Sequence, residues 1–267
     1  RAMRIYWQSF IDAQSNPEYM ALLSGYLNQI AAPGTEVTLR GISPPDRDLS
    51  RLSEFRCAIQ AIDQALDAQA EGFDAVVLGH FQDPGLMEMK SALSIPVIGV
   101  GEASLHLAAQ LGRQIGLITL DQTFRHLHHE QADRYGLGAR VTHIAGLHVA
   151  PGYFADAFRG DGAARTRMIA RLRELAEPMV AAGCDVIVPA GVLPGLLISD
   201  ERGLCARHAP IVNCVAAGLL QAEMMVRLHQ LNGLQPNRGP FCAQAGAQAI
   251  ADFRGLLARH QPGKDTP

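Results

Sequence analysis

Gly72-Phe-Asp-Ala-Val-Val-Leu-Gly-His80 is a stretch that this chain contains in two versions. It aligns without gaps with Gly183-Cys-Asp-Val-Ile-Val-Pro-Ala-Gly191, and Pro-Gly-Leu follows each version, at Pro84 and at Pro194. Each version is a short apolar run between turn residues, which is typical of a buried strand. An internal repeat of this kind predicts that the chain is built from two structurally related halves.

A second pair of segments matches in the same order. Ile95-Pro-Val-Ile-Gly-Val-Gly-Glu102 corresponds to Ala209-Pro-Ile-Val-Asn-Cys-Val-Ala216, and a helical pattern follows each of them. Buried strands followed by helices also resemble one another generically, so chance similarity stays open as an alternative. The shared order of the two pairs favours two homologous lobes.

Eight short β-branched runs alternate with longer amphipathic segments along the chain. These runs lie at residues 4–7, 36–39, 75–78, 97–100, 115–119, 140–144, 186–188 and 211–213. Such alternation is typical of βα units around a parallel sheet. The sequence therefore predicts an α/β protein of two pseudo-symmetric lobes, each with a mostly parallel four-stranded sheet. We expect the first lobe to comprise residues 3–103 plus returning helices within 214–260, and the second to comprise 104–213.

Apolar residues recur at helical spacing in two of the intervening segments. One stripe consists of Leu52, Phe55, Ile59, Ile62 and Leu66, and the other of Ile169, Leu172, Leu175 and Met179. Each stripe predicts a helix with one face turned toward a sheet. We expect Pro178 to kink or shorten the second helix. A further helix is expected over residues 243–259, with 261–267 frayed.

The composition is that of a globular protein, with 48% hydrophobic and 18% charged residues among 267. The formal net charge of −3 gives no basic field that would hold nucleic acid or an anionic membrane. Five cysteines, an odd and scattered set, favour reduced thiols over a disulfide framework. We expect a cytoplasmic protein that binds a small molecule and, like most soluble enzymes of this size, forms a homo-oligomer.

Strand ends are where a ligand is expected. In open α/β sheets ligands bind outside the carboxyl ends of the strands, so two lobes related by a pseudo-twofold axis would share one cleft there. The repeat places His80 and Gly191 opposite each other across it. Imidazole is the side chain best matched to proton transfer at neutral pH. His80 is therefore the first catalytic candidate, although a histidine that only satisfies backbone groups at a strand end is the alternative.

Two carboxylates lie near His80 in the expected cleft. Asp83 is placed as the N-cap of a following helix with Pro84 at the first helical position. Glu102 stands at the next strand-to-helix junction, where Gly99 and Gly101 let the backbone approach a ligand or a neighbouring segment closely. Glu102 is expected either to orient His80 or to act as an acid itself. Complementing the helix dipole is the alternative role.

Polar and small residues at the other strand ends are candidate ligand contacts. These candidates are Trp7, Gln8 and Ser9 after the first strand, Phe81 and Gln82 beside His80, Thr119 and Asp121 after the fifth strand, and Gly191, Val192 and Cys214 in the second lobe. Turn and capping duties explain such residues equally well.

We expect no metal and no cofactor. His126, His129 and Glu130 share a helix face, but their spacing is not His-Glu-x-x-His, and a solvated face is the better interpretation. The glycines form neither a dinucleotide fingerprint nor a P-loop. Cys57 and Cys184 are expected in the core, Cys205 and Cys242 in connecting segments, and only Cys214 near the cleft.

Residues 74–86, 96–103 and 185–191 together resemble the aspartate/glutamate/hydantoin racemase superfamily, closest to its hydantoin racemase branch. The resemblance extends from Met3 to about Leu231. It implies two pseudo-symmetric α/β lobes, no cofactor, and two cysteines that face each other across the cleft, one removing and one returning a proton beside a carbonyl. Matched residue by residue, these two cysteine positions fall on His80 and Gly191, and neither is a cysteine here.

Loss of both thiols leaves one evident base on one face of the substrate. We therefore expect a cofactor-independent isomerase that moves a proton at a carbon next to a carbonyl, in an activated substrate such as a cyclic ureide, a malonate-like acid or a keto acid. A decarboxylase, another lyase or a hydrolase that uses His80 as its base is the alternative. A non-catalytic binding protein is the third possibility, because a two-lobed fold without its thiols can still hold a ligand.

Overall fold

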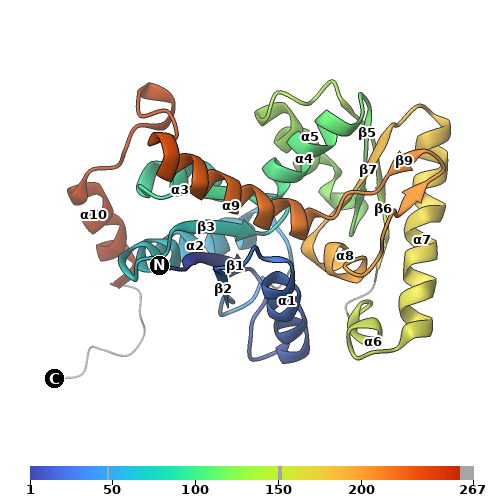
Figure 1. The fold of residues 1–267 in the computed structure, drawn as a ribbon, viewed down its shortest axis with the longest axis horizontal. Coiled ribbons are helices and arrows are strands. Elements are labelled where there is room, and N and C mark those ends of the chain that lie inside the picture. The colour runs from blue at the N-terminus through green and yellow to red at the C-terminus, as the bar shows by residue number, and fades with distance from the viewer. Residues whose placement is uncertain (47, 150–151, 259–267) are drawn as a thin grey trace.

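The computed structural model describes residues 1–46, 48–149 and 152–258, and it contains two parallel sheets (Figure 1). The first sheet has the order β2-β1-β3-β4, formed by β1 (Met3–Ser9), β2 (Thr35–Arg40), β3 (Ala75–Gly79) and β4 (Val97–Gly99). The second has the order β6-β5-β7, formed by β5 (Ile115–Thr119), β6 (Val141–Gly146) and β7 (Val186–Ala190). The equivalent order of the strands confirms the predicted two-lobed α/β fold.

The predicted fourth strand of the second sheet is not formed. Residues 211–213 contribute one parallel bridge, Ile187 to Ile211, and one further backbone bond from Val212 N–H to the Ile187 carbonyl. The segment before them is used differently, since β8 (Cys205–Ala206) and β9 (Ala209–Pro210) form a small antiparallel hairpin. Asn213 then caps the next helix, so the chain leaves the sheet before a strand can extend.

Helices fill the connections between strands. They are α1 (Pro17–Ile30), α2 (Arg51–Ala70), α3 (Leu86–Ala92), α4 (Val100–Leu111), α5 (Arg125–Arg134), α6 (Ala155–Phe158), α7 (Gly162–Ala181), α8 (Val192–Leu197), α9 (Cys214–Asn232) and α10 (Ala247–Ala258), with the 3-10 turns η1 (Gln122–Phe124) and η2 (Pro240–Cys242). The described helices include none that is both long and apolar enough to cross a bilayer.

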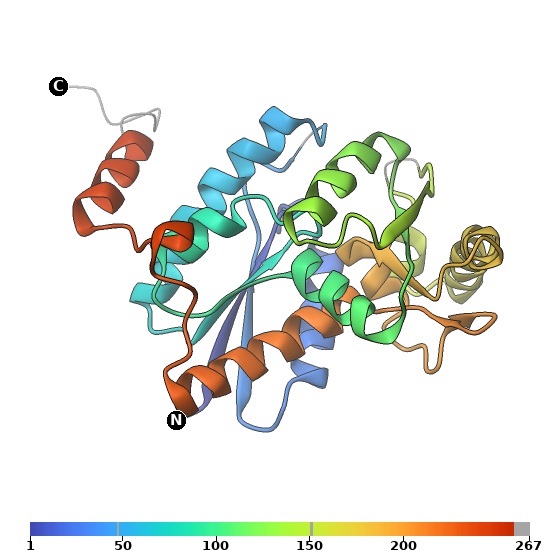
Figure 2. The same ribbon diagram turned by 90° about the horizontal axis from the view of Figure 1, so that it is seen from above.

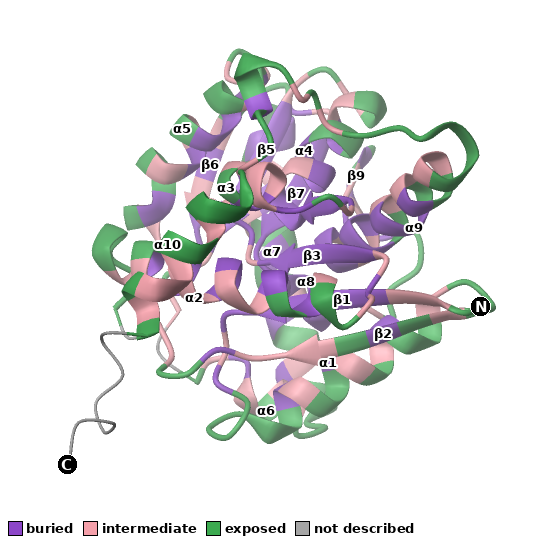
Figure 3. Cartoon of the chain, turned by 90° about the vertical axis from the view of Figure 1, so that its left-hand side faces the viewer, coloured by how far each residue is buried: buried purple, intermediate pink, exposed green. Residues whose placement is uncertain are grey.

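Two helices join the lobes. Helix α4 packs along α9, α4 also contacts β7, and α9 lies on β3 and β4, an arrangement that Figure 2 shows from above. One hydrophobic core runs through this contact and includes Trp7 and Val77 from the first sheet and Leu117 and Val188 from the second. Burial of this shared core fixes the two sheets relative to each other. In Figure 3 the strands β3, β5 and β7 are buried, whereas β2 at the edge of the first sheet carries intermediate and exposed residues.

Helix α2 does not bury the face that its apolar stripe predicts. Leu52 and Phe55 are 78% and 64% exposed, whereas Ile62 and Leu66 are buried as expected. The inward face at the start of α2 is instead formed by Glu54, Cys57, Ala58 and Ala61. Small side chains on this face bring the helix close to its sheet, and they place the Glu54 carboxylate inside the protein. The predicted stripe of α7 is confirmed, with Leu172 and Met179 buried.

The segment after α9, residues 233–258, returns to the first lobe. The Arg238 guanidinium donates to the carbonyls of Lys90 and Leu93 at the end of α3. Helix α10 then docks on α2, where Arg254 pairs with Asp63 and Asp67 while Phe253 packs on the apolar cluster between α2 and the first sheet. The helix expected in residues 243–259 is present, and the segment predicted to fray lies outside the described residues.

Candidate active site

His80 is held by a carboxylate from α2. Its Nε2 lies 3.0 Å from Oε1 of Glu54, and the two side chains are 17% and 10% exposed. Helix α2 begins at Arg51 because Ser50 is its N-cap: the Ser50 hydroxyl accepts a hydrogen bond from Ser53 N–H. Glu54 therefore sits in the first turn, facing the residue that follows β3. A buried carboxylate at this distance fixes the ring orientation and tautomer of the imidazole.

The ring of Phe10 packs flat against His80. The two ring centroids are 4.6 Å apart and the planes differ by 9°. Phe10 follows β1, and Ser9 at the end of β1 pairs in register with Gly79 at the end of β3, so the two side chains leave adjacent strands. Stacking on one side and Glu54 at Nε2 leave Nδ1 as the ring nitrogen without a hydrogen-bond partner among the described residues.

Asp83 is buried and caps α4 instead of α3. Its Oδ1 accepts from Gly101 N–H at 3.0 Å and its Oδ2 from Glu102 N–H at 2.7 Å. Helix α3 begins at Leu86, because Asp83 has φ of +52° and Gly85 takes the left-handed N-cap position. The predicted N-cap role of Asp83 for α3 is therefore wrong. The amide groups at the start of α4 are occupied by this carboxylate.

Glycines near α4 are required by Asp83 rather than by a ligand. A Cβ on Gly99 would come 2.5 Å from Asp83 Oδ1, and a Cβ on Gly101 would come 2.0 Å from the Phe81 carbonyl oxygen. Of the two roles predicted for these glycines, close approach of a neighbouring segment is the one seen.

Burial raises the pKa of Asp83 to about 7 against the lowering effect of the Tyr135 hydroxyl, which donates to Oδ2 at 2.6 Å.

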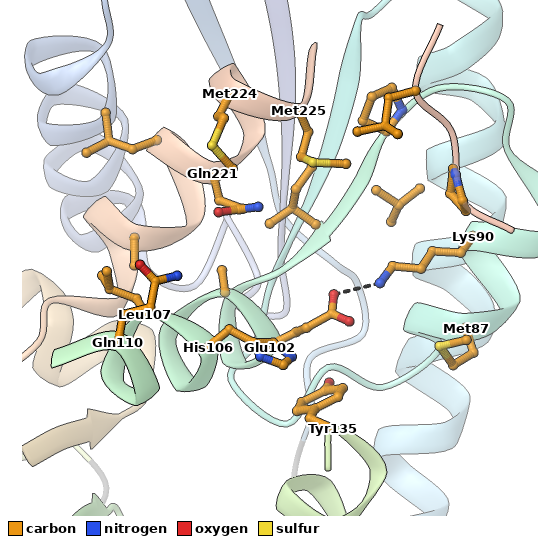
Figure 4. Close-up of a pocket in the computed structure, with 18 of the residues that line it drawn as sticks. Met87, Lys90, Glu102, His106, Leu107, Gln110, Tyr135, Gln221, Met224 and Met225 are labelled. Atoms are coloured by element: carbon orange, nitrogen blue, oxygen red, sulfur yellow. Dashed lines mark hydrogen bonds and ion pairs between the residues drawn. The ribbon is translucent and has the colours of Figure 1, made fainter. Parts of the chain in front are cut away.

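Glu102 does not orient His80. Its carboxylate pairs with Lys90 Nζ at 2.6 Å, in a groove of about 1180 Å³ that Figure 4 shows in close-up. The groove lies between α3, α4 and α9 and is lined by polar residues such as His106 and by apolar ones such as Met224. The expectation that Glu102 would support the imidazole is corrected: it points from α4 into this groove, and Glu54 takes the supporting role.

A buried polar chain lies at the carboxyl end of β5 in the second lobe. Thr119 Oγ1 is 2.9 Å from Nε2 of His128, and His128 Nδ1 is 3.3 Å from Oε1 of Gln131. These three side chains are at most 2% exposed. Desolvation lowers the pKa of His128 to about 4, so the ring is neutral at physiological pH. The His128 ring also packs edge-on against Phe81 beside His80, with centroids 5.7 Å apart.

Gly191 directly follows β7 in the second lobe and has no side chain. Its φ of 167° is extended backbone, which any residue adopts, and a Cβ would meet Pro194 Cδ at 3.1 Å. The room predicted on this side is therefore limited by Pro194. The Cys214 thiol donates to the Gly191 carbonyl at 3.1 Å, and full burial raises its pKa to about 12. Cys214 does lie beside Gly191, but as a neutral thiol turned to the backbone.

Most of the other predicted ligand contacts lie in the interior. Trp7, Gln8, Ser9, Phe81 and Thr119 are 0–1% exposed, and Val192 is 7% exposed. Gln8 bonds to Tyr6 and to the Ser9 carbonyl, and Ser9 Oγ accepts from Ile11 N–H, so both have local structural roles. Gln82 is half-buried, and Asp121 caps η1 through Thr123 N–H. Turn and cap roles thus account for Ser9 and Asp121 in this predicted set.

The helix face with His126, His129 and Glu130 does not form a metal site among the described residues. Across the described residues, no cluster of three or more His, Cys, Asp or Glu side chains could hold a metal ion. Glu130 pairs with Arg51 through both carboxylate oxygens, and His126 is exposed. Cys57 and Cys184 are buried as predicted, and Cys242 lies in the segment that connects α9 and α10, as expected, where it is also buried.

Sequence reasoning missed Glu54, His128 and Gln131. Glu54 sits four residues after the N-cap Ser50 on a helix whose apolar stripe pointed the other way, so its inward position had no signal in periodicity. His128 and Gln131 share one face at a spacing of three, but both are polar and lie in a helix that is mostly polar, so no apolar stripe marks this face as buried. Only the pairing of the lobes brings that face against Phe81.

Comparison with known proteins places this site in a family. The Asp/Glu/Hydantoin racemase family model matches residues 10–222. Hydantoin racemase of Pseudomonas sp. (strain NS671) is 26% identical over 117 residues, 43% of this chain and 47% of that protein. Hydantoin racemase of Paenarthrobacter aurescens is 28% identical over 156 residues, 58% of this chain and 62% of that protein. The chain thus spans only about half to three fifths of the length of these relatives.

A solved structure shows the same fold. Allantoin racemase from Klebsiella pneumoniae superposes with a TM-score of 0.75 at 20% identity, covering 91% of this chain and 94% of that chain. The family model extends over both sheets, from the residue after β1 to the middle of α9. It therefore includes His80, Glu54 and Gly191, and the chain belongs to the Asp/Glu/hydantoin racemase family.

Proposed function

We propose that this protein is a cofactor-independent isomerase that moves a proton at the carbon next to a carbonyl of a small cyclic ureide. The His80–Glu54 pair carries this proposal, because an imidazole oriented by a buried carboxylate is the arrangement of a general base. Relatives named hydantoin racemase and allantoin racemase support a ureide as the substrate class.

The geometry assigns the base to one ring nitrogen. With Nε2–H donating to Glu54, the lone pair is on Nδ1, the nitrogen without a partner among the described residues. Nδ1 would take the proton from the carbon beside the carbonyl, leaving a planar enolate, while Glu54 stabilises the imidazolium that forms. A positioned base of this kind contributes about 10²–10⁴-fold in rate. That suits a carbon already acidified by an adjoining carbonyl.

The opposite face of the enolate is the face toward Gly191. Gly191 offers no side chain, and the Cys214 thiol beside it is committed to the Gly191 carbonyl. Inversion would therefore use a water molecule to return the proton on that side, whereas return from His80 would regenerate the original enantiomer. The water route brings solvent hydrogen to the substrate carbon, and the His80 route does so when the imidazolium exchanges its proton with solvent before returning it.

A single-base decarboxylation is the second candidate. It is favoured by Gly191, which offers no side chain opposite His80. Loss of carbon dioxide followed by protonation on one face needs only one proton carrier. The two reactions differ in product mass. Isomerisation leaves the mass unchanged in ordinary water, and decarboxylation lowers it by one carbon dioxide.

The test uses separate enantiomers of a 5-monosubstituted hydantoin and of allantoin, with an arylmalonate as the lyase substrate. Circular dichroism follows inversion and mass spectrometry follows carbon dioxide loss, each against the uncatalysed rate. We expect inversion above background with His80 present and its loss in His80→Gln. Turnover of the malonate alone would support the lyase, and no turnover of any of the three would contradict the proposal.

A further inference from the structure

Gln131 connects the strand-end segments of the two lobes. Its side-chain nitrogen donates to the Phe81 carbonyl and to Asp83 Oδ2, the latter at 3.2 Å, and its oxygen faces His128 Nδ1 at 3.3 Å. The side chain is 2% exposed. Gln131 belongs to α5 beside the second sheet, whereas Phe81 and Asp83 follow β3 in the first. Gln131 therefore links α5 to the turn after β3, and His128 extends this link to Thr119 at the carboxyl end of β5.

The partners of Gln131 leave only one orientation for its amide. A backbone carbonyl can only accept, so the NH₂ group must face the Phe81 carbonyl, and it then also lies toward Asp83 Oδ2. The amide oxygen then faces His128, which must donate from Nδ1. Nε2 of the neutral ring is left as an acceptor for the Thr119 hydroxyl, 2.9 Å away. The chain is polarised in one direction, from Thr119 at the end of β5 to the turn after β3.

That turn is the one that carries His80. Asp83 N–H donates to the His80 carbonyl at 2.9 Å, which closes a tight turn over residues 80–83. Gln131 binds this turn at its second residue and at its last. Phe10 and Glu54 hold the His80 ring from within the first lobe, whereas Gln131 holds the two residues Phe81 and Asp83 of the same turn from the second.

The space around Gln131 leaves no room for the turn to shift. A Cβ added to Gly101 would come 2.2 Å from Gln131 Nε2 and 2.0 Å from the Phe81 carbonyl oxygen. The first turn of α4 thus packs directly against the hydrogen bond between Gln131 and the Phe81 carbonyl, and only a glycine fits at position 101. Interiors packed this closely transmit displacements instead of absorbing them.

We propose that Gln131 is a positioning residue for His80, which sets the imidazole relative to the second lobe and so to the substrate carbon. The proposal rests on the function assigned to His80 above. Gln131 itself touches no substrate: it fixes the turn through Phe81 and Asp83. Misplacement of a reacting group by about 1 Å costs on the order of 100-fold in rate, so loss of this contact lowers turnover more than substrate binding.

Two neighbouring isosteric substitutions test the proposal. Gln131→Glu places an oxygen against the Phe81 and Asp83 oxygens, while Glu130→Gln makes the reverse change on an exposed residue that pairs only with Arg51. Gln131→Met removes the donors and keeps the length of the side chain. We expect both Gln131 variants to lower kcat about 10-fold or more with KM changed less than about 3-fold, and Glu130→Gln to match the wild type.

Nuclear magnetic resonance of ¹⁵N- and ¹³C-labelled histidine tests the same proposal without turnover. In the wild type we expect His128 as the Nδ1–H tautomer, and we expect the His80 resonances to shift in Gln131→Met and stay unchanged in Glu130→Gln. An Nε2–H tautomer of His128, or a folded Gln131→Met with wild-type kcat and wild-type His80 resonances, would overturn it. Absence of turnover by the wild type would contradict the proposed function alone, because the resonances still report on positioning.

Discussion

The imidazole Nε2 of His80 lies 3.0 Å from the Glu54 carboxylate, which reaches it from the first turn of α2. This pair stands where the family resemblance places the first of two catalytic thiols. A thiolate acts as a base without a second residue, but a histidine needs a group that fixes its tautomer and stabilises its charged form. We propose that Glu54 fills this role.

Glu54→Gln is expected to lower kcat by about 10- to 100-fold without unfolding the protein. The amide keeps the shape of the side chain, but it no longer stabilises the imidazolium and can present its NH₂ group to Nε2, which selects the wrong tautomer. Steady-state kinetics with a hydantoin enantiomer measures the loss, and a thermal melt confirms the fold.

Glu102→Gln is the matched control for Glu54→Gln. Glu102 pairs with Lys90 in the groove between α4 and α9 instead of contacting His80. We expect its kcat to stay within about 2-fold of the wild type, since exposed or half-exposed ion pairs contribute at most about 1 kcal/mol. Equal losses in the two variants would refute the assignment of Glu54 as the partner of His80.

Gly191→Cys is expected to speed inversion by giving the second face a proton carrier. The extended backbone accepts a side chain here, and a Cβ meets only Pro194 within 3.4 Å, so the neighbour must move by a few tenths of an ångström. Gly191→Ala measures the effect of that Cβ alone. We expect it to lower the free energy of unfolding by about 1 kcal/mol. Circular dichroism of the substrate should show inversion at least about 10-fold faster in the cysteine variant than in the alanine variant.

Gly191→Ser separates the thiol from its bulk. A serine hydroxyl has nearly the same size but is too weak an acid to exchange protons at this site. Its inversion rate should stay near that of the alanine variant. If the serine and cysteine variants invert equally fast, the second face does not lack a proton carrier.

His128 is expected to make stability depend on pH. Its pKa falls from an ordinary value near 6.5 to about 4 in the folded protein, so the unfolded chain binds the proton first as pH drops. Holding the ring neutral therefore adds its full contribution to the free energy of unfolding above about pH 6.5, and this contribution is lost as pH falls through about 4. The loss is about 3 kcal/mol at most. Urea unfolding of the wild type and His128→Gln between pH 4 and 7 measures it.

The quantity to compare is the difference in unfolding free energy between these two proteins. Asp83 titrates with the opposite sign, because its pKa of about 7 makes the folded state lose stability as pH rises from about 4 to 7. This contribution is common to both proteins and cancels in the difference. A difference that stays flat across the range would show that His128 is not held neutral.

The fold was predictable because it depends on features that are local in sequence. Apolar runs such as 75–78 and 186–188 become strands wherever they lie in a parallel sheet, and their repetition indicated two lobes. The strand expected at 211–213 failed because Asn213 caps α9. That competition between a sheet edge and a helix start is decided by tertiary packing.

The site was predictable only in part. His80 was found because it directly follows a strand, a position that sequence reveals. The sequence offers Asp83 and Glu102 as its supporting carboxylates, whereas burial of small alanines on α2 turns Glu54 inward instead. Gln131 and His128 depend on contact between the lobes, for which a helix of exposed polar residues gives no periodic signal.

Exchange of solvent deuterium into the acidic carbon of a 5-monosubstituted hydantoin tests the central claim most directly, because it reports proton removal whether or not inversion follows. In heavy water the wild type should incorporate deuterium well above the uncatalysed rate. His80→Gln, shown to be folded by its thermal melt, should lose about 100-fold or more of that rate. A folded His80→Gln that exchanges deuterium as fast as the wild type would contradict the role of His80 as the base.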